Sequence, residues 1–197
     1  MYGDEANIAR RLAARNRVRL SIFNEARECG FADGFGERKP DPRFSMVLPE
    51  RFGKPSSEYI KSKYPNEDRP DIILSDEGAL VDMAMSVMPM EWDDVPVRMD
   101  AYRSATERLF PECTHISKNI EKTKHLPCIA CYDYMGFAAG GEVYFLVFLT
   151  DLPGCELFGC FTCPAWLRGE WETLARQMIR TIKPLENNNE KEEGKNA

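Results

Sequence analysis

Residues 126–163 contain the pattern that most constrains how this chain can fold. Three strand-like segments, 126–137, 142–150 and 156–163, are separated by two short turn compositions, Ala-Ala-Gly-Gly at 138–141 and Asp-Leu-Pro-Gly at 151–154. Links this short join antiparallel strands, so the segments are predicted to form a meander. The middle segment contains VYFLVFL, which is apolar on both alternating faces. Both faces of this sheet are therefore predicted to be covered.

Two helices are predicted next to the meander. Residues 97–110 repeat apolar residues every three or four positions, Asp94 is a good N-cap, and Pro96 fits the first turn. A last helix begins at Pro164 and stops at Pro184. Its apolar residues recur at helical spacing, namely Trp171, Leu174, Ala175, Met178 and Ile182.

Upstream of these elements, residues 44–48 are predicted to form a short strand and residues 72–90 a hairpin. Residues 53–71 are polar and interrupted by proline, which favours a loop with one helical turn. The predicted fold class is therefore α+β, an antiparallel sheet with helices on both faces in an α/β/α sandwich.

The chain is predicted to have four parts. Residues 1–30 form an N-terminal basic helix, 31–43 a linker rich in Gly, Pro and charge, 44–184 the sandwich domain, and 185–197 a disordered polar tail. The N-terminal helix either binds an anionic partner or is a solvated face of a packing element. Its basic residues are Arg10, Arg11, Arg15, Arg17 and Arg19.

Charge and composition exclude several classes of protein. The 197 residues carry a net charge of −6, which argues against a nucleic-acid footprint spread over the domain. The longest apolar run, residues 143–149, falls far short of the roughly 20 residues of a membrane helix, and the N-terminus has no signal-peptide core. We expect no membrane span and a cytoplasmic protein.

Two C-x2-C pairs suggest chemistry at first sight. Cys128 and Cys131 form one pair, and Cys160 and Cys163 form the other, a spacing typical of thiolate zinc sites. A zinc ion needs all four sulfurs at about 2.3 Å from one point. Residues three apart on a strand, however, point to opposite faces. We therefore expect buried free cysteines and no cofactor, with a zinc or redox site as the alternative.

The predicted strand register also separates the two pairs. A loop at 138–141 places Cys128 opposite Asp151, and a loop at 151–154 places Cys163 opposite Glu142. Asp151 and Glu142 are nine residues apart on the middle strand, so the two thiols are expected roughly 30 Å apart.

Other candidate chemistry is dispersed. Cys113 and His115 lie two residues apart, as a nucleophile and base might, but nothing marks the thiol as activated. Glu91, Asp93 and Asp94 precede a helix, where acidic residues serve as caps. An enzyme with a site scattered in sequence, around His115, Glu91 and Tyr134, stays an alternative. Glycine-rich phosphate loops and nucleophile elbows are absent from the sequence.

The order of elements carries a resemblance to a known family. A strand ending in Pro (FSMVLP), a hairpin, a helix, a meander and a closing helix after a Cys-Pro step (GCFTCPAWLRGEWETLARQMIRTIK) resemble the PsbP-like superfamily over residues 44–183. That family has a three-layer α/β/α sandwich and includes photosystem accessory proteins, a Ran-binding factor, bacterial lipoproteins and secretion adaptors. The resemblance implies a binding or assembly role, and it transfers no functional residue.

The leading functional prediction is a non-enzymatic domain that binds a protein or a small ligand, with a protein partner or self-association favoured. No catalytic or cofactor-binding residue is predicted. The alternatives are a thiolate metal or redox protein that uses Cys128, Cys131, Cys160 and Cys163, and the dispersed enzyme.

Overall fold

The computed structural model describes residues 34–78, 80–90, 93–138 and 140–185. The predicted N-terminal basic helix, and the predicted tail beyond Leu185, lie outside the described residues. In chain order the elements are β1 (Phe35–Asp41), β2 (Phe44–Pro49), α2 (Ser57–Lys63), β3 (Ile72–Asp76), β4 (Val81–Pro89), α3 (Val95–Leu109), β5 (Thr114–Glu121), β6 (Ile129–Ala138), β7 (Gly141–Leu152), β8 (Cys155–Pro164), the 3-10 turn η1 (Ala165–Leu167), α4 (Arg168–Arg180) and β9 (Lys183–Pro184).

The larger sheet has six strands in the order β3-β4-β8-β7-β6-β5, all paired antiparallel. The predicted meander is confirmed as β6-β7-β8, and the predicted hairpin over 72–90 is confirmed as β3-β4. The meander strands are rich in aromatic and β-branched residues, which pack well on a pleated surface. β5 joins the meander as its edge strand, an element that the sequence pattern did not predict.

The register of the first meander hairpin is confirmed, and that of the second is shifted. Phe137 pairs with Glu142, as predicted, but Leu152 rather than Thr150 pairs with Cys155. The second turn consists of only Pro153 and Gly154, with Gly154 at φ +76°, in the region that favours glycine. A shift of two residues keeps every side chain on its predicted face, because strands alternate with period 2.

A second, three-stranded sheet has the order β1-β2-β9. The prediction of an irregular linker over 31–43 is wrong for Phe35–Asp41, which pair along β2 as β1. Pro40 lies where the register shifts between Arg38 and Asp41, a position at which an edge strand tolerates proline. The folded domain therefore begins at least nine residues before position 44, because β1 starts at Phe35.

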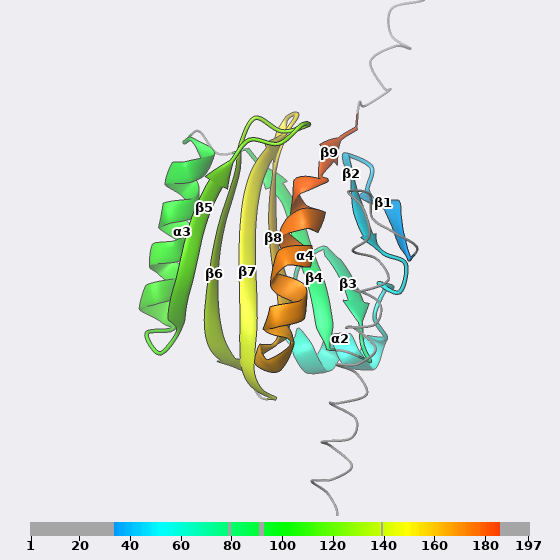
Figure 1. Ribbon diagram of the computed structural model, residues 1–197, viewed down its shortest axis with the longest axis vertical. Helices are drawn as coiled ribbons and strands as arrows, with labels where there is room; N and C mark the ends of the chain where they lie inside the picture. The colour runs from blue at the N-terminus through cyan, green and yellow to red at the C-terminus, as the bar shows by residue number, and fades with distance from the viewer. Residues whose placement is uncertain (1–33, 79, 91–92, 139, 186–197) are drawn as a thin grey trace, which may run out of the picture.

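Helices cover both faces of the six-stranded sheet, as predicted. Figure 1 shows α3 on one face and α4 on the other, with the small sheet beyond α4. We call these the α3 face and the α4 face. No helix within the described segments is both long and apolar enough to cross a lipid bilayer.

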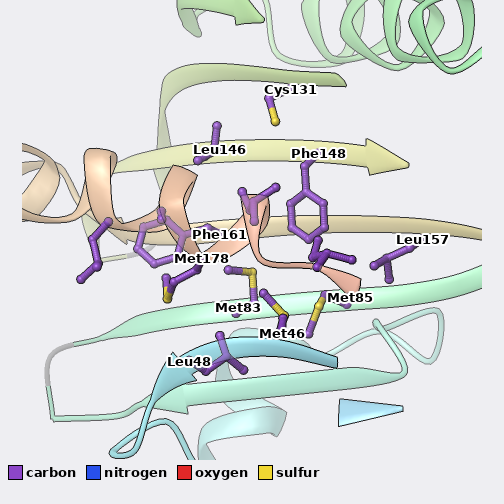
Figure 2. Close-up of a cluster of buried hydrophobic side chains, with 14 of the residues drawn as sticks. Met46, Leu48, Met83, Met85, Cys131, Leu146, Phe148, Leu157, Phe161 and Met178 are labelled. Carbon is purple, nitrogen blue, oxygen red and sulfur yellow. The ribbon is translucent and has the colours of Figure 1, made fainter. Parts of the chain in front are cut away.

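The main core lies on the α4 face. Met46 and Leu48 of β2 point toward Met83 and Met85 of β4, and Met178 of α4 approaches the same region (Figure 2). All five side chains have at most 1% of their surface exposed. Burying an apolar side chain of this size contributes about 1.5–3 kcal/mol, so this layer is the main source of stability.

The two predicted helices differ at their ends. Asp94 occupies the N-cap position of α3 and Pro96 lies in its first turn, as predicted, but the Asp94 side chain makes no capping hydrogen bond. α4 begins later than predicted, at Arg168, because β8 continues through Pro164 and η1 follows it. Its apolar side faces the core, with Trp171, Leu174, Ala175, Met178 and Ile179 buried.

Candidate functional site

The two faces of the central strands are covered to different degrees. On the α4 face, Tyr144 and Phe148 of β7 and Phe161 of β8 are completely buried. On the α3 face of the same strands, Phe145 and Phe158 are only half-buried. The central strands of such a sheet are normally covered on both sides, so a partly exposed aromatic surface at this position is a candidate binding site.

The strand register locates this surface between the two helices of the α3 face. One row of cross-strand neighbours runs from Asp82 of β4 through Thr162, Phe145 and Tyr134 to His115 of β5. α2 contacts the Asp82 end of this row, whereas α3 approaches the His115 end. The half-buried residues of β7 and β8 therefore lie between the helices.

α3 forms one border of the surface. The ring of Tyr102 lies 4.7 Å from that of Phe158, and the hydroxyl oxygens of Thr106 and Tyr132 are 2.7 Å apart. Leu109 follows Tyr102 by seven residues, so it lies on the same side of the helix, and it is 72% exposed. We call the surface the interhelical strip. It comprises the partly or fully exposed residues Tyr102, Leu109, Phe145, Phe158 and Cys160, together with the buried Tyr134.

α2 forms the other border through a buried carboxylate. Asp82, which has no exposed surface, accepts hydrogen bonds from the hydroxyls of Tyr59 (3.0 Å) and Tyr64 (3.1 Å) and forms an ion pair with Lys63. Lys63 also donates to Thr162 Oγ1 at 3.2 Å. Burial of the two phenols, reinforced by the Asp82 charge, raises the pKa of Tyr59 and of Tyr64.

A second ionic cluster closes the end of the strip at the start of α3. Arg98, only 6% exposed, forms ion pairs with Glu156 and Asp151 of the β7-β8 hairpin. Tyr102 donates a weaker hydrogen bond to Glu156, at 3.4 Å. Burial and the neighbouring carboxylates act in opposite directions on Arg98, and the net effect raises its pKa.

The strip itself carries no charge at neutral pH. Burial raises the pKa of Tyr134 well above its usual value. Burial also raises the pKa of Cys160 to about 12. Phe145, Phe158 and Leu109 cannot ionise. The strip is therefore a neutral, aromatic surface bordered by two ionic clusters, which suits recognition of apolar groups better than acid–base chemistry.

The structure does not bring the four cysteines of the C-x2-C pairs together. Cys131 and Cys163 pack in the core of the α4 face, whereas Cys128 and Cys160 pack on the α3 face. Ile129, next to Cys128, pairs with Thr150, and Cys163 pairs with Tyr144. Thr150 and Tyr144 are six residues apart on β7, or about 20 Å. The separation is smaller than the roughly 30 Å expected, because the second hairpin is shifted by two residues, but one ion still cannot reach both pairs.

The ionisation of these thiols is also suppressed. Burial is the main cause in every case: it raises the pKa of Cys131 to about 12 and raises the pKa values of Cys128 and Cys163. A protonated thiol is a poor nucleophile and a poor metal ligand. Among the described residues, no group of three or more His, Cys, Asp or Glu side chains is placed to hold a metal ion.

The residues proposed for a dispersed catalytic site are only partly brought together. His115 and Tyr134 are cross-strand neighbours with ring centroids 5.7 Å apart, and His115 Nε2 lies 3.8 Å from Glu107 Oε1. Within the described part of the chain, neither ring nitrogen of His115 has a hydrogen-bond partner. Burial raises the pKa of Cys113, so the thiol beside His115 is not activated. Glu91 lies outside the described residues.

The residues that border the strip were not predicted from the sequence. Asp82 was the one with a visible signal, since it is a carboxylate between apolar residues of a strand (VDMAM). A buried carboxylate requires donors, and these come from α2, about 20 positions earlier in the chain. Their proximity is a property of the fold and not of any local pattern.

Comparison with solved structures identifies the class of fold. The domain is similar to cyanobacterial PsbP (CyanoP) from Synechocystis sp. PCC 6803, at 9% sequence identity and a TM-score of 0.57, over 80% of this chain and 98% of that one. This match confirms the predicted PsbP-like fold.

Two further structures show weaker similarity. The Ran-binding protein Mog1p of Saccharomyces cerevisiae matches at 13% identity, over 75% of this chain and 94% of that one, with a TM-score of 0.47. LpqN of Mycobacterium tuberculosis, involved in cell envelope biogenesis, matches at 9% identity, over 78% and 93%, with a TM-score of 0.49. No protein-family model matches the chain, and no curated protein sequence matches it significantly.

Proposed function

We propose that this chain is a non-enzymatic, protein-binding domain of the PsbP-like fold, and that the interhelical strip is its binding surface. One observation carries the proposal: the central strands are completely buried on the α4 face at Tyr144 and Phe161, but only half-buried on the α3 face at Phe145 and Phe158. Aromatic side chains are enriched at protein–protein contacts, where a few well-packed residues carry most of the affinity.

The chemistry of the strip indicates what kind of partner it binds. Its side chains are neutral at physiological pH. The ionic groups at its borders are already paired, Asp82 with Lys63 on one side and Arg98 with Glu156 on the other. A partner segment that presents apolar side chains gains free energy there without breaking an ion pair. Nucleic acid is not the expected partner, because a net charge of −6 repels phosphates.

The thiol and dispersed-enzyme alternatives have weaker support. A thiolate site would need the two C-x2-C pairs on one face and ionised, whereas the pairs are divided between faces and burial raises their pKa values. The six described cysteines are all free, which is consistent with the proposed location in a reducing compartment such as the cytoplasm.

Photocrosslinking in cells tests the proposal. A photoreactive amino acid is placed at Leu109 on the border of the strip, at Phe145 on its floor, and at Ser104 on the exposed outer side of α3 as a control. We expect one and the same protein to be captured from Leu109 and Phe145 but not from Ser104. Equal capture from Ser104, or different proteins from the two strip positions, would contradict the proposal.

A further inference from the structure

α2 is held to the sheet almost entirely by polar contacts. None of its residues, Ser57–Lys63, is buried, and none belongs to either of the two apolar clusters of the domain. By contrast, α4 buries five side chains, Trp171 among them. A helix without a buried apolar side lacks the interaction that fixes most helices in place.

One end of α2 is tied to the β3-β4 turn. The backbone N–H of Ser56, its N-cap, donates to Glu77 Oε1 at 2.6 Å, and its hydroxyl donates to Glu77 Oε2 at 3.2 Å. The same hydroxyl oxygen accepts from the N–H of Tyr59. These contacts lie at the N-terminal end alone, so they would survive a swing of the rest of the helix.

The other end is held mainly by one carboxylate, with one further hydrogen bond from Lys63 to Thr162. Tyr59, Lys63 and the C-cap residue Tyr64 all contact Asp82. The carboxylate has no exposed surface, so each of the three donors offsets part of the cost of burying its charge. The helix therefore stays in place through donors that converge on one group.

Cys160 lies next to these contacts on the same face of the sheet. Asp82 pairs with Thr162 and Ala84 with Cys160, so the thiol is one position further along the same face. Lys63 and Asp82 lie close enough to affect the ionisation of Cys160. The thiol in turn affects that of Tyr64. Because Lys63 donates to Thr162, the neighbour of Cys160 on this face, a swing of the Lys63 end of α2 is expected to increase the exposure of Cys160.

We propose that α2 is a releasable cover, which swings from the Asp82 carboxylate while the rest of the domain stays folded and thereby extends the interhelical strip across β8 toward β4. The opening of α2 does not depend on the proposed function. Only the idea that this opening controls access to the strip rests on the proposal that the strip binds a protein. Elements with few buried apolar contacts open at low free energy, far below that of global unfolding.

Per-residue thiol modification of the full chain tests the opening. The protein is treated with N-ethylmaleimide at one fixed pH, and modification of Cys160 and Cys163 is followed by mass spectrometry. Cys163 is three residues away on the same strand but faces the main core, so it reports global unfolding. The variants are Tyr64→Phe and Tyr59→Phe, each of which removes one hydrogen bond to Asp82 and keeps the ring.

Tyr144→Phe is the matched control, because it also removes a phenol hydrogen bond to a buried aspartate, Asp133, but beneath α4. We expect Cys160 to react faster than Cys163 in the wild type, and each α2 variant to raise the rate of Cys160 about tenfold, because the lost hydrogen bond holds α2 closed. Tyr144→Phe should raise the rate of Cys163 and leave that of Cys160 unchanged, because its hydrogen bond is broken only when the domain unfolds.

Two results would overturn the proposal. Equal rates for Cys160 and Cys163 in every variant would mean that α2 opens only when the domain unfolds. A Cys160 rate that the α2 variants do not change would mean that α2 does not cover the thiol. The experiment contains no binding partner. A failure of the interhelical strip to bind a protein would therefore leave this result intact, and the two proposals fail separately.

Discussion

Asp133 and Arg176 form an ion pair beneath α4, with Arg176 Nη2 2.8 Å from Asp133 Oδ2. The carboxylate has no exposed surface, and it also accepts hydrogen bonds from the hydroxyls of Tyr144 (2.8 Å) and Ser117. The guanidinium is therefore the group that compensates a buried charge in the middle of the β6 strand.

Removing the guanidinium should destabilise the folded domain. Arg176→Leu leaves the Asp133 charge buried with only neutral donors, so we expect the free energy of unfolding to fall by about 3 kcal/mol. Urea denaturation measures this difference. Adding Asp133→Asn to Arg176→Leu should recover part of the loss, because the charge is removed as well. A loss below about 1 kcal/mol in the single variant would show that the pair does not compensate the carboxylate.

Gly159 of β8 is required by the ring of Phe148. A Cβ at position 159 would lie 2.2 Å from Cζ of that ring, and Phe148 is completely buried. Gly159→Ala should lower the free energy of unfolding by at least about 2 kcal/mol. Gly169→Ala in α4 is the control: its Cβ would meet nothing within 4 Å, so we expect no loss and a small gain. Equal effects in thermal or urea unfolding would rule out the steric explanation.

Local patterns predicted the meander and the helices but not the whole sheet system. The alternation of VYFLVFL and the Gly-rich turns specified β6, β7 and β8 because hairpin pairing is local. β1 escaped prediction because FGERKPD contains Gly, Pro and four charged residues. Its strand conformation comes from pairing with β2, and the composition of a half-exposed edge strand is not distinctive.

The interhelical strip could not be predicted for a different reason. The apolar patterns correctly assigned Phe145 and Phe158 to the sheet, but how far α2 and α3 leave them uncovered depends on tertiary placement. α2 is located by Asp82, which is about 20 residues away in sequence, and α3 by contacts to β6 and β7. The separation of the cysteines, by contrast, could be predicted from the sequence, since strand alternation alone places Cys160 and Cys163 on opposite faces.

The two carboxylates that contact Arg98 should differ greatly in importance. Glu156 is 1% exposed, so Glu156→Gln leaves the buried guanidinium without its buried carboxylate partner and should lower the free energy of unfolding by about 2–3 kcal/mol. The Asp151 side chain is 37% exposed, and solvent screens its charge, so Asp151→Asn should cost less than about 1 kcal/mol. Urea denaturation of the two variants checks the order. The reverse order would mean that the hairpin end is held mainly through Asp151.

Stability should fall in alkaline solution because of the buried thiols. Cys131 has a pKa raised from 9.0 to about 12. Above pH 9 the unfolded chain has lost this proton while the folded chain retains it, so stabilisation present below pH 9 is lost progressively between pH 9 and 12. One thiol contributes a slope of at most about 1.4 kcal/mol per pH unit.

Comparison with Cys131→Ala isolates this contribution. Under reducing conditions, the free energy of unfolding of the variant should decline less steeply between pH 9 and 10.5 than that of the wild type. A parallel decline in the two proteins would show that Cys131 titrates alike in the folded and unfolded chains.

The affinity of the partner captured from the strip tests the central claim most directly. Isothermal titration calorimetry of the purified partner is carried out with the wild type, Leu109→Glu and Ser104→Glu, which place the same charge on opposite sides of α3. Leu109 is 72% exposed, so its substitution should leave the fold intact. We predict a Kd at least about tenfold weaker for Leu109→Glu and unchanged for Ser104→Glu, since a charge must be desolvated only at a buried contact. A Kd that is unchanged in Leu109→Glu, or weakened equally in both variants, would contradict this claim.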